Sequence, residues 1–418
     1  MEFKRYKLGT IAKTSSGATP TSTKKIYYEG GTIPWINSGE LSNPFIDKAN
    51  NYITKLGFDN SSTKMYAPNE TVLLAMYGAT AGKAALLQIE ACTNQAICAI
   101  IPDQSIVDPL FLKYKLDTMY NYLVGLSSGS ARDNLSQTGI SNLTIDIPSL
   151  AIQKRISKVL YSLDRKIALN RAINQNLEAL AKQLYDYWFV QFDFPDENGR
   201  PYKSSGGAMV WNDGLNKYIP NYWNVLKLSD LLREDRVKQI NPQDNPNKVF
   251  RHLSFPSLDA CGSFYEEKGE NIKSNKIVVK DEYVLAAKLN PWIKRIAWGT
   301  TDEDLICSTE FVVLNPYDKN LKAFLFLLVN QKPFIDYCTS SSTGTSHSQR
   351  RVKPDIMKLY KFPYNEKVAQ EFSKQVLPII EITKKNNEQN RELAMQRDKL
   401  LPLLMNGQVS LNSDLFDH

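Results

Sequence analysis

The chain has 418 residues, and its 42% hydrophobic content supports folded cores and excludes a disordered chain. A length of this size suggests two or three domains, and the formal net charge of +7 is compatible with a polyanionic partner. No apolar run is long enough for a membrane span, and the five scattered cysteines form no CxxC pair, which argues against a zinc site or a disulfide framework and fits a cytoplasmic protein.

The first predicted element is a globular region over residues 1–148. Short apolar runs bounded by turn residues predict strands at 72–76 and 96–101. A short helix is expected over 109–122. We therefore expect an α+β fold for this region, which ends at Pro148.

A long helix is predicted next, over residues 149–191. Asn170 and Asn174 interrupt its apolar seam, and a buried polar residue at such a position can fix the register of two helices. The aromatic run 185–189 either contacts a partner subunit or anchors the helix end to a globular region. The seam has the 3–4 spacing of a coiled coil and consists of Ile152, Ile156, Val159, Leu163, Ile167, Ile173, Leu177, Leu180 and Leu184.

A second globular region follows over residues 192–362. The turn chemistry of its first ten residues marks a boundary. Apolar runs predict strands at 276–279 and 311–314, and a helix is expected over 321–337. We expect a second α+β region.

A second long helix is predicted over residues 363–407, followed by a tail, 408–418. Its middle, 384–392, is too polar to be buried alone, so we expect an insertion there to disturb packing least. Each long helix covers about 40 residues, or roughly 60 Å, at 1.5 Å per residue. Such helices are marginal alone in water, so we expect them to pair with each other in antiparallel fashion. The alternative is two unrelated helices, each packed on its own globular region.

The two halves have the same order of elements, which indicates an internal duplication. Cys92 falls on Cys307 and Pro148 falls on Pro363, a shift of 215 residues. Duplication of a whole domain plus a helix predicts a pseudo-two-fold repeat.

Motifs that would indicate an enzyme are incomplete. The stretch 78–83 resembles a P-loop, but the loop is one residue short and Ala84 stands where a Ser or Thr must hold magnesium. The stretches 43–45 and 290–292 each have one proline where the adenine-methyltransferase motif has two. The three histidines form no HExxH. We therefore expect no catalytic residue, no metal site and no cofactor on this chain.

Short pieces in a fixed order along the duplicated chain carry a family resemblance. These pieces are 7–9, 17–20, 33–36, 77–83, 129–132, 135–136, 147–153, 188–189, 288–291 with Arg295, and 400–409. In the order of these pieces the chain resembles the specificity subunits of type I restriction–modification enzymes over essentially its whole length. One departure is that the second helix starts at 362–366 without the glutamine found at Gln153, which affects local contacts only.

The resemblance implies a fold and a division of labour. Residues 1–148 and 192–362 would be two target-recognition domains, each of which reads one half of a split site in double-stranded DNA. Residues 149–191 and 363–407 would be spacer helices that set the gap between the half-sites and dock two modification subunits. Those subunits would bind S-adenosylmethionine and methylate adenine, and a restriction or motor subunit would use ATP and magnesium.

The candidate DNA-binding residues are basic and amide side chains on loops. Phosphate contacts supply affinity and base-edge contacts supply sequence information, and Ser- and Gly-rich loops let the backbone approach phosphate closely. In the first region the candidates are Lys83, Arg132, Asn134 and Gln137; in the second they are Lys288, Asn290, Lys294, Arg295, His347, Gln349, Arg350 and Arg351.

Two other functions stay open at this point. One is a coiled-coil scaffold that joins two proteins without reading DNA, and the other is a self-contained DNA-modifying enzyme with an unfamiliar site. DNA binding that weakens steeply as salt rises would argue against the scaffold, and methylation or cleavage by the purified chain would support the enzyme.

Overall fold

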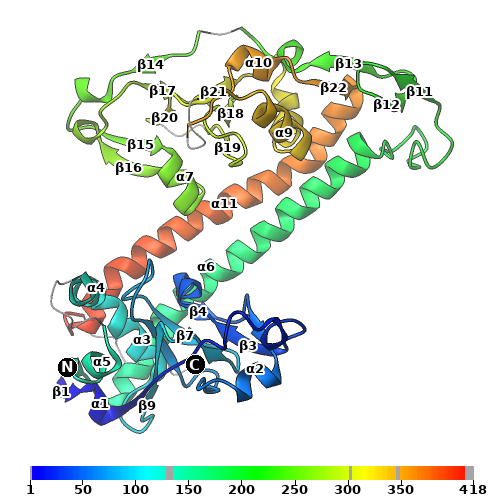
Figure 1. Cartoon of the computed structure of the whole chain (residues 1–418). Coiled ribbons are helices and arrows are strands. Elements are labelled where there is room, and N and C mark those ends of the chain that lie inside the picture. The colour runs from blue at the N-terminus through cyan, green and yellow to red at the C-terminus, as the bar shows by residue number, and fades with distance from the viewer. Residues whose placement is uncertain (1, 129–134, 235, 301–303, 345–348, 410–418) are drawn as a thin grey trace. The chain divides into compact units, whose positions relative to one another are not determined.

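The computed structural model describes residues 2–128, 135–234, 236–300, 304–344 and 349–409. The chain divides into two compact units, unit 1 (Met1–Lys166 with Leu393–His418) and unit 2 (Ile167–Glu392). The boundary passes through both long helices, α6 (Leu150–Tyr185) and α11 (Glu366–Met405), drawn in Figure 1. Among the described residues, no helix is long and apolar enough to cross a membrane.

Unit 1 is built around a five-stranded sheet of order β2-β9-β6-β7-β4. β4 and β7 are parallel, and the other neighbours are antiparallel. The all-apolar segment Val72–Ala75 is buried throughout, as expected of a central strand covered on both faces. The bounds are β2 (Ala12–Ser16), β4 (Phe45–Ile46), β6 (Val72–Ala75), β7 (Ala84–Leu87) and β9 (Ile97–Pro102).

A smaller sheet and a two-stranded ribbon complete the strands of unit 1. The smaller sheet has the order β5-β3-β8, with β3 parallel to β8, and the ribbon pairs β1 with β10. The bounds are β1 (Lys4–Lys7), β3 (Ile33–Ile36), β5 (Tyr52–Ile53), β8 (Cys92–Thr93) and β10 (Thr144–Ile147).

The helices of unit 1 pack on this framework together with one end of each long helix. Asp108 caps α3 by accepting a hydrogen bond from the Phe111 amide at 2.9 Å. Ile156 and Leu160 of α6 lie in the same core cluster as Leu404 of α11. The short helices are α1 (Leu8–Ile11), α2 (Lys55–Asp59), α3 (Pro109–Thr118), α4 (Tyr120–Ser128), α5 (Gln137–Ser141) and the 3₁₀ turns η1 (Lys25–Tyr27) and η2 (Ser38–Ser42).

Unit 2 contains a three-stranded sheet, β19-β18-β21, and a five-stranded sheet, β14-β17-β20-β15-β16. β15 and β20 are parallel, as β3 and β8 are in unit 1. A ribbon pairs β13 with β22, and a hairpin pairs β11 with β12. The bounds are β11 (Met209–Asn212), β12 (Lys217–Pro220), β13 (Asn224–Lys227), β14 (Gln239–Ile240), β15 (Val249–Leu253), β16 (Tyr265–Lys268), β17 (Lys276–Val278), β18 (Val284–Ala287), β19 (Ile296–Trp298), β20 (Leu305–Ser308), β21 (Phe311–Leu314) and β22 (Lys361–Tyr364).

An aromatic cluster joins the long helices to unit 2. A π-helical turn, η3 (Asp186–Val190), continues α6, and the Phe189 ring lies 4.8 Å from Phe324 and 5.0 Å from Phe372, centroid to centroid. The aromatic run therefore anchors the helix end. The other helices are α7 (Phe255–Cys261), α8 (Lys322–Val329), α9 (Lys332–Ser340), α10 (Pro354–Lys358) and the 3₁₀ turns η4 (Leu228–Leu231), η5 (Pro242–Asp244), η6 (Gly269–Asn271) and η7 (Lys319–Leu321).

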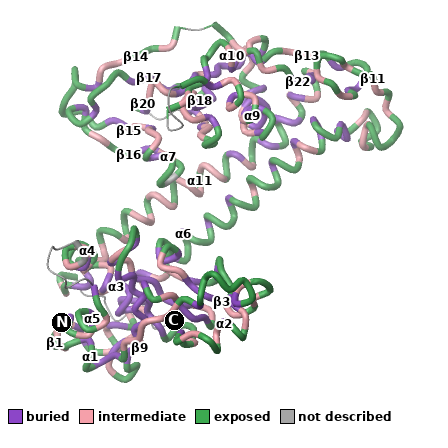
Figure 2. Tube along the Cα trace, viewed as in Figure 1, coloured by how far each residue is buried: buried purple, intermediate pink, exposed green. Residues whose placement is uncertain are grey.

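The long helices are antiparallel and meet through a polar layer rather than through a continuous apolar seam. In unit 2, the Asn170 amide donates to Gln389 at 2.8 Å, while the Asn174 amide, one turn later, donates to Asn387 at 2.8 Å. Both asparagines are buried, whereas Ile173 and Leu180, which we expected in the seam, are 37% and 45% exposed. The asparagines occupy the inward face, so these apolar side chains point outward, and Figure 2 shows much of both helices as exposed.

A glutamine near the start of the second helix makes a contact similar to that of Gln153 in the first. In unit 1, Gln153 accepts a hydrogen bond from the amide of Asp108, the residue that caps α3, at 2.9 Å. In unit 2, Gln370 donates to the carboxylate of Asp318, the cap of η7, at 3.0 Å. Gln370 therefore makes a contact like that of Gln153, although residues 362–366, where we expected the second helix to start, contain no glutamine.

Candidate nucleic-acid interface

The structure brings two of the predicted basic segments of unit 2 together. Asn290 follows β18 with a left-handed backbone, φ 49°, a conformation that asparagine tolerates better than most residues. Its amide donates to the Arg350 carbonyl at 2.8 Å, and its side-chain oxygen accepts from the Arg350 amide at 3.1 Å. The carbonyl of Lys288 accepts from Val352 at 3.0 Å. Residues 288–290 and 350–352 thus form one corner.

The two arginines at this corner have different partners. The Arg350 guanidinium donates to the Ser342 carbonyl at 2.7 Å, which uses one of its five donors. Arg351 is engaged more fully, because its Nε and Nη2 lie 3.1 and 3.3 Å from the two oxygens of Glu310. Glu310 neutralises the charge of Arg351, so Arg350 is the better candidate for contact with an anion.

Arg295 has a structural partner. Its guanidinium forms a bidentate pair with Asp259, with Nε 2.7 Å from Oδ1, and lies 4.6 Å from the centre of the Phe255 ring. The side chain is only 11% exposed. The hydrogen bond from Arg295 lowers the pKa of Asp259 below its ordinary 3.8. The neighbouring Lys294 is exposed, as is Gln349.

We expect Arg295→Ala to destabilise unit 2 by about 1.5–3 kcal/mol, the range for hydrogen bonds to a charged group. The pair contributes fully above pH 3.8, and its contribution is lost as the pH falls through the lowered pKa of Asp259. The variant and the wild type should therefore converge at strongly acidic pH. Urea unfolding at pH 7 and at pH 3 measures this, with Lys294→Ala as the control, and equal unfolding midpoints at pH 7 would contradict it.

The described candidates of unit 1 do not form such a corner. Lys83 lies half-buried in the turn between β6 and β7, which Gly78 and Gly82 form with φ values of 87° and 81°. Gln137, at the start of α5, uses its amide within the fold: it donates to the Thr14 carbonyl at 2.7 Å and accepts from Ser16 at 3.2 Å. Three further candidates, Arg132, Asn134 and His347, lie outside the described residues.

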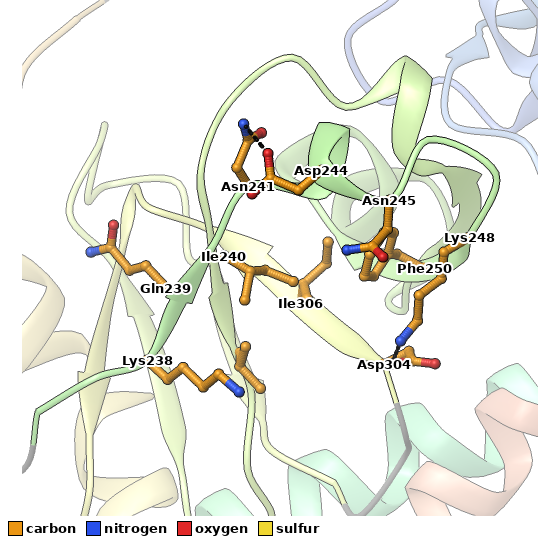
Figure 3. Close-up of a pocket in the computed structure, with 11 residues that line it drawn as sticks. Lys238, Gln239, Ile240, Asn241, Asp244, Asn245, Lys248, Phe250, Asp304 and Ile306 are labelled. Carbon is orange, nitrogen blue, oxygen red and sulfur yellow. Dashed lines mark hydrogen bonds and ion pairs between the residues drawn. The ribbon is translucent and has the colours of Figure 1, made fainter.

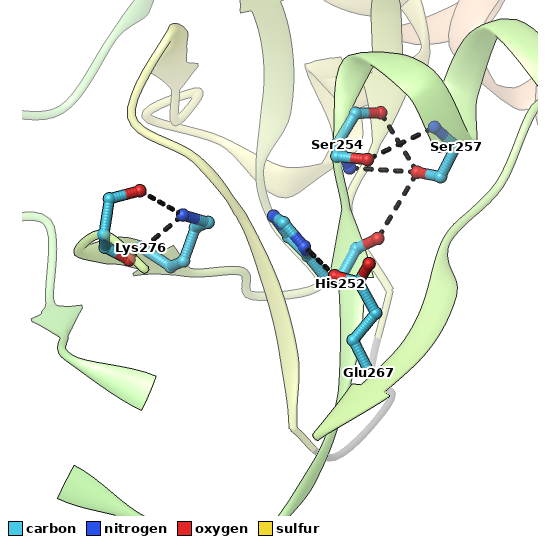
Figure 4. Close-up of polar contacts among 6 residues, drawn as sticks. His252, Ser254, Ser257, Glu267 and Lys276 are labelled. Atoms are coloured by element: carbon cyan, nitrogen blue, oxygen red, sulfur yellow. Dashed lines mark hydrogen bonds and ion pairs between the residues drawn. The ribbon is translucent and has the colours of Figure 1, made fainter. Parts of the chain in front are cut away.

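A Ser–His–Glu grouping on the five-stranded sheet of unit 2 resembles a catalytic arrangement but lacks its geometry (Figure 4). The Nδ1 of His252 lies 2.5 Å from Glu267, and burial lowers the pKa of the imidazole. The hydroxyl of Ser257 donates to the backbone carbonyl of His252 at 3.3 Å, not to its ring. Ser257 and Ser254 instead cap α7. No serine here is positioned for activation by the imidazole.

Sequence reasoning missed the carboxylates that engage the predicted arginines. Asp259 lies 36 positions from Arg295 and Glu310 lies 41 positions from Arg351. No local pattern marks such pairs: Asp259 lies on α7 and Glu310 lies in the turn between β20 and β21, and neither position indicates an arginine partner. Within the described part of the chain, no group of three or more histidines, cysteines or acidic residues could hold a metal ion.

Comparison with known proteins identifies relatives over the whole chain. Residues 1–179 match the family model described as the type I restriction modification DNA specificity domain. The specificity subunit of the type I restriction enzyme MjaIX from Methanocaldococcus jannaschii is 28% identical over 96% of this chain and 92% of its own length. The HindI specificity subunit from Haemophilus influenzae is 24% identical over 74% of this chain and 79% of its own length.

A solved structure shares the fold. The type I restriction–modification S subunit from M. genitalium superposes with a TM-score of 0.63 at 15% identity, over 97% of this chain and 96% of that chain. This likeness confirms the expected fold class, with two α+β regions and two long helices. The relatives are named as specificity subunits of type I restriction enzymes, in agreement with the expectation of a non-catalytic subunit.

Proposed function

We propose that this chain, which is similar to type I restriction–modification specificity subunits over most of its length, reads a bipartite site in double-stranded DNA, one half-site per unit. The observation that carries this proposal is the duplication: in each unit, one core cluster combines strands with one end of both long helices. Two similar reading domains suit a site with two separate halves. In this proposal the antiparallel helices set the number of base pairs between the halves.

The exposed apolar residues on the helices support docking of the modification subunits. On α6, Leu169, Ile173 and Leu180 are 55%, 37% and 45% exposed. Their spacing of four and seven residues puts them on one face of the helix. A contiguous exposed apolar surface is a common mark of a protein interface. We propose that two methyltransferase subunits dock on the helices, with S-adenosylmethionine bound by them and ATP and magnesium by a restriction subunit. All of these act in the cytoplasm.

The reading surface of unit 2 in this proposal is the corner formed by residues 288–290 and 350–352, with Lys294 beside it. Lys294 is exposed, and within the described ranges no carboxylate pairs with it. The guanidinium of Arg350 keeps free donors for a phosphate or a base edge. Lys83 in the β6–β7 turn is the matching candidate in unit 1, since this turn and the 288–295 segment each follow the central strand of their sheet.

DNA binding by the assembled subunits tests the proposal. The target is identified by mapping methylated adenines in cells that express the chain with its methyltransferase subunits, and duplexes with this site are titrated at several salt concentrations. Affinity should fall steeply with salt, and Lys294→Ala should reduce the slope of log K against log salt by about one. The exposed Lys319→Ala serves as the control. Binding that does not depend on salt or sequence would favour a scaffold without DNA reading.

A further inference from the structure

A turn beside the corner of unit 2 presents two large apolar side chains to solvent. The loop from β18 to β19 turns at Asn290–Ile293, where the Ile293 amide donates to the Asn290 carbonyl at 2.9 Å. Pro291 in this turn is buried, whereas Trp292 and Ile293 are 41% and 39% exposed. Among the described residues, the Trp292 side chain makes no hydrogen bond and contacts no other ring. Two adjacent apolar side chains in water gain free energy when a partner covers them.

The hollow on the five-stranded sheet of unit 2 offers no such surface (Figure 3). Its apolar residues Phe250 and Ile306 are 2% and 1% exposed, so a ligand cannot reach them. On its rim, Lys248 is paired with Asp304 at 2.5 Å. The turn at Asn290–Ile293, rather than this hollow, presents apolar side chains that a partner can contact.

The turn is held from both ends. On one side, Asn290 is bonded to the backbone of Arg350 through its amide and its side-chain oxygen. On the other side, the Arg295 carbonyl accepts from the Ala287 amide at 3.0 Å, and the Arg295 guanidinium is paired with Asp259. A loop that is already ordered loses little conformational entropy when a partner binds.

The charges around the turn favour a polyanionic partner. Lys288 and Lys294 flank the turn in the sequence, and Arg350 lies at the same corner. The carboxylates of Asp259 and Glu310 are both committed to ion pairs with arginine. The charge that remains unpaired in this group is therefore positive. Duplex DNA complements it, because DNA combines anionic phosphates with flat apolar base faces.

Unit 1 has an exposed aromatic side chain in the matching turn. β6 lies between β7 and β9 as β18 lies between β19 and β21, and all four pairs are antiparallel. In the turn after β6, Tyr77 is 46% exposed, and its side chain has no hydrogen bond or ring contact in the described part of unit 1. The Gly82 amide closes the turn by donating to the Ala75 carbonyl at 2.9 Å, and Lys83 follows. Both copies of the duplicated turn thus combine an exposed ring with a lysine.

We propose that Trp292 is a wedge that inserts between two base pairs of the half-site read by unit 2, and that Tyr77 has the same role in unit 1. Ile293 packs against the base face that the wedge uncovers, and Lys294 contacts phosphate. Apolar wedges partly unstack the bases and kink the duplex by roughly 20–90°. The cost of the kink depends on the base step that is opened, so the wedge adds sequence preference without hydrogen bonds to base edges. This inference rests on the proposed function.

Binding and bending of DNA by the assembled complex test the inference. Duplexes with the site found by methylation mapping carry a donor dye at one end and an acceptor dye at the other. Trp292→Ala should weaken binding roughly 5- to 150-fold, the range for removal of an aromatic side chain that stacks on a base. At saturation its duplex should be straighter, with less energy transfer than in the wild-type complex. The slope of log K against log salt should not change, because no phosphate contact is lost.

Two matched variants serve as controls. Trp292→Phe keeps an aromatic ring and should retain most of the affinity and the bend. Tyr265→Ala removes a ring on β16 that is also 41% exposed but lies outside the corner, and it should behave as wild type.

Three results would count against these proposals. Wild-type affinity or an unchanged bend in Trp292→Ala would overturn the inference. Weaker assembly of Trp292→Ala with the modification subunits in the absence of DNA would also overturn it, because the indole would then belong to a protein interface. A wild-type complex whose binding depends on neither salt nor sequence would instead overturn the proposed function.

Discussion

Replacing Asp164 with alanine is expected to lower the free energy of unfolding of unit 1 by about 3–5 kcal/mol, the usual cost of removing one partner from a buried ion pair. Asp164 on α6 is 4% exposed, and its Oδ1 accepts from Arg397 of α11 at 2.8 Å. Its other oxygen accepts from the hydroxyl of Tyr114 at 2.6 Å. The variant would leave the buried phenol of Tyr114 without its acceptor and would leave the half-buried guanidinium of Arg397 with only the exposed Asp398 as a partner.

The position of Asp164 explains why the effect should be large. Tyr114 lies on α3, which packs against the sheet of unit 1, so the one carboxylate ties both long helices to the globular part. Burial and the nearby Asp164 charge both raise the pKa of Tyr114, so the phenol stays protonated and acts as a donor. The contact thus joins three helices in one hydrogen-bonded network.

Urea and thermal unfolding followed by circular dichroism measure this loss. Asp398→Ala is the matched control, since Asp398 contacts the same guanidinium at 2.7 Å but is 65% exposed. An exposed pair contributes roughly 0–1 kcal/mol, so this variant should stay close to wild type. If Asp164→Ala were no less stable than Asp398→Ala, the buried network would not hold the helices to unit 1.

Inserting four helix-forming residues into both long helices is expected to widen the gap in the DNA site by one or two base pairs. Four residues add about 6 Å of helix at 1.5 Å per residue, and DNA rises about 3.4 Å per base pair. The insertions belong between Lys166 and Ile167 and between Glu392 and Leu393, where the chain divides into its two units. The contacts within each unit are then preserved.

The polar layer explains why both helices must be changed. We expected the segment 384–392 to tolerate an insertion best, but its side chains bond across the helix pair. Gln389 and Asn387 accept from Asn170 and Asn174, and the Asn386 amide donates back to Asn174 at 2.8 Å. An insertion within this segment would displace every one of these partners. The polar composition of residues 384–392 therefore does not make the segment tolerant of an insertion.

Mapping methylated adenines reads out the result. The double insertion should keep both half-site sequences and change only their separation. The single insertion in α6 is the control: it shifts the register of one helix against the other, breaks the amide layer, and should abolish methylation and lower the melting temperature. A double insertion that altered a half-site while the gap stayed constant would show that the helices are not the spacer.

Local patterns in the sequence were sufficient to predict the elements and the duplication. The apolar run at 72–76 became β6, the central strand of its sheet, and the run at 311–314 became β21, an edge strand, because a strand covered on both faces requires a continuous apolar run. The long helices followed from the 3–4 spacing of apolar residues. The shift of 215 residues was visible because a repeat needs no knowledge of contacts.

Partners distant in sequence were decided by the tertiary structure alone. The sequence identified Arg295 and Arg351 only as basic residues in loops. The fold places Asp259 beside Arg295 and Glu310 beside Arg351, and these carboxylates form ion pairs with the two guanidinium groups. The same holds for Asn170, whose partner Gln389 is 219 positions away. Burial of a polar group is costly unless a hydrogen-bond partner is present. A polar residue at a buried position therefore implies that a partner exists but does not identify that partner. Periodicity records which face of an element is buried, whereas the identity of the facing residue depends on how distant segments pack.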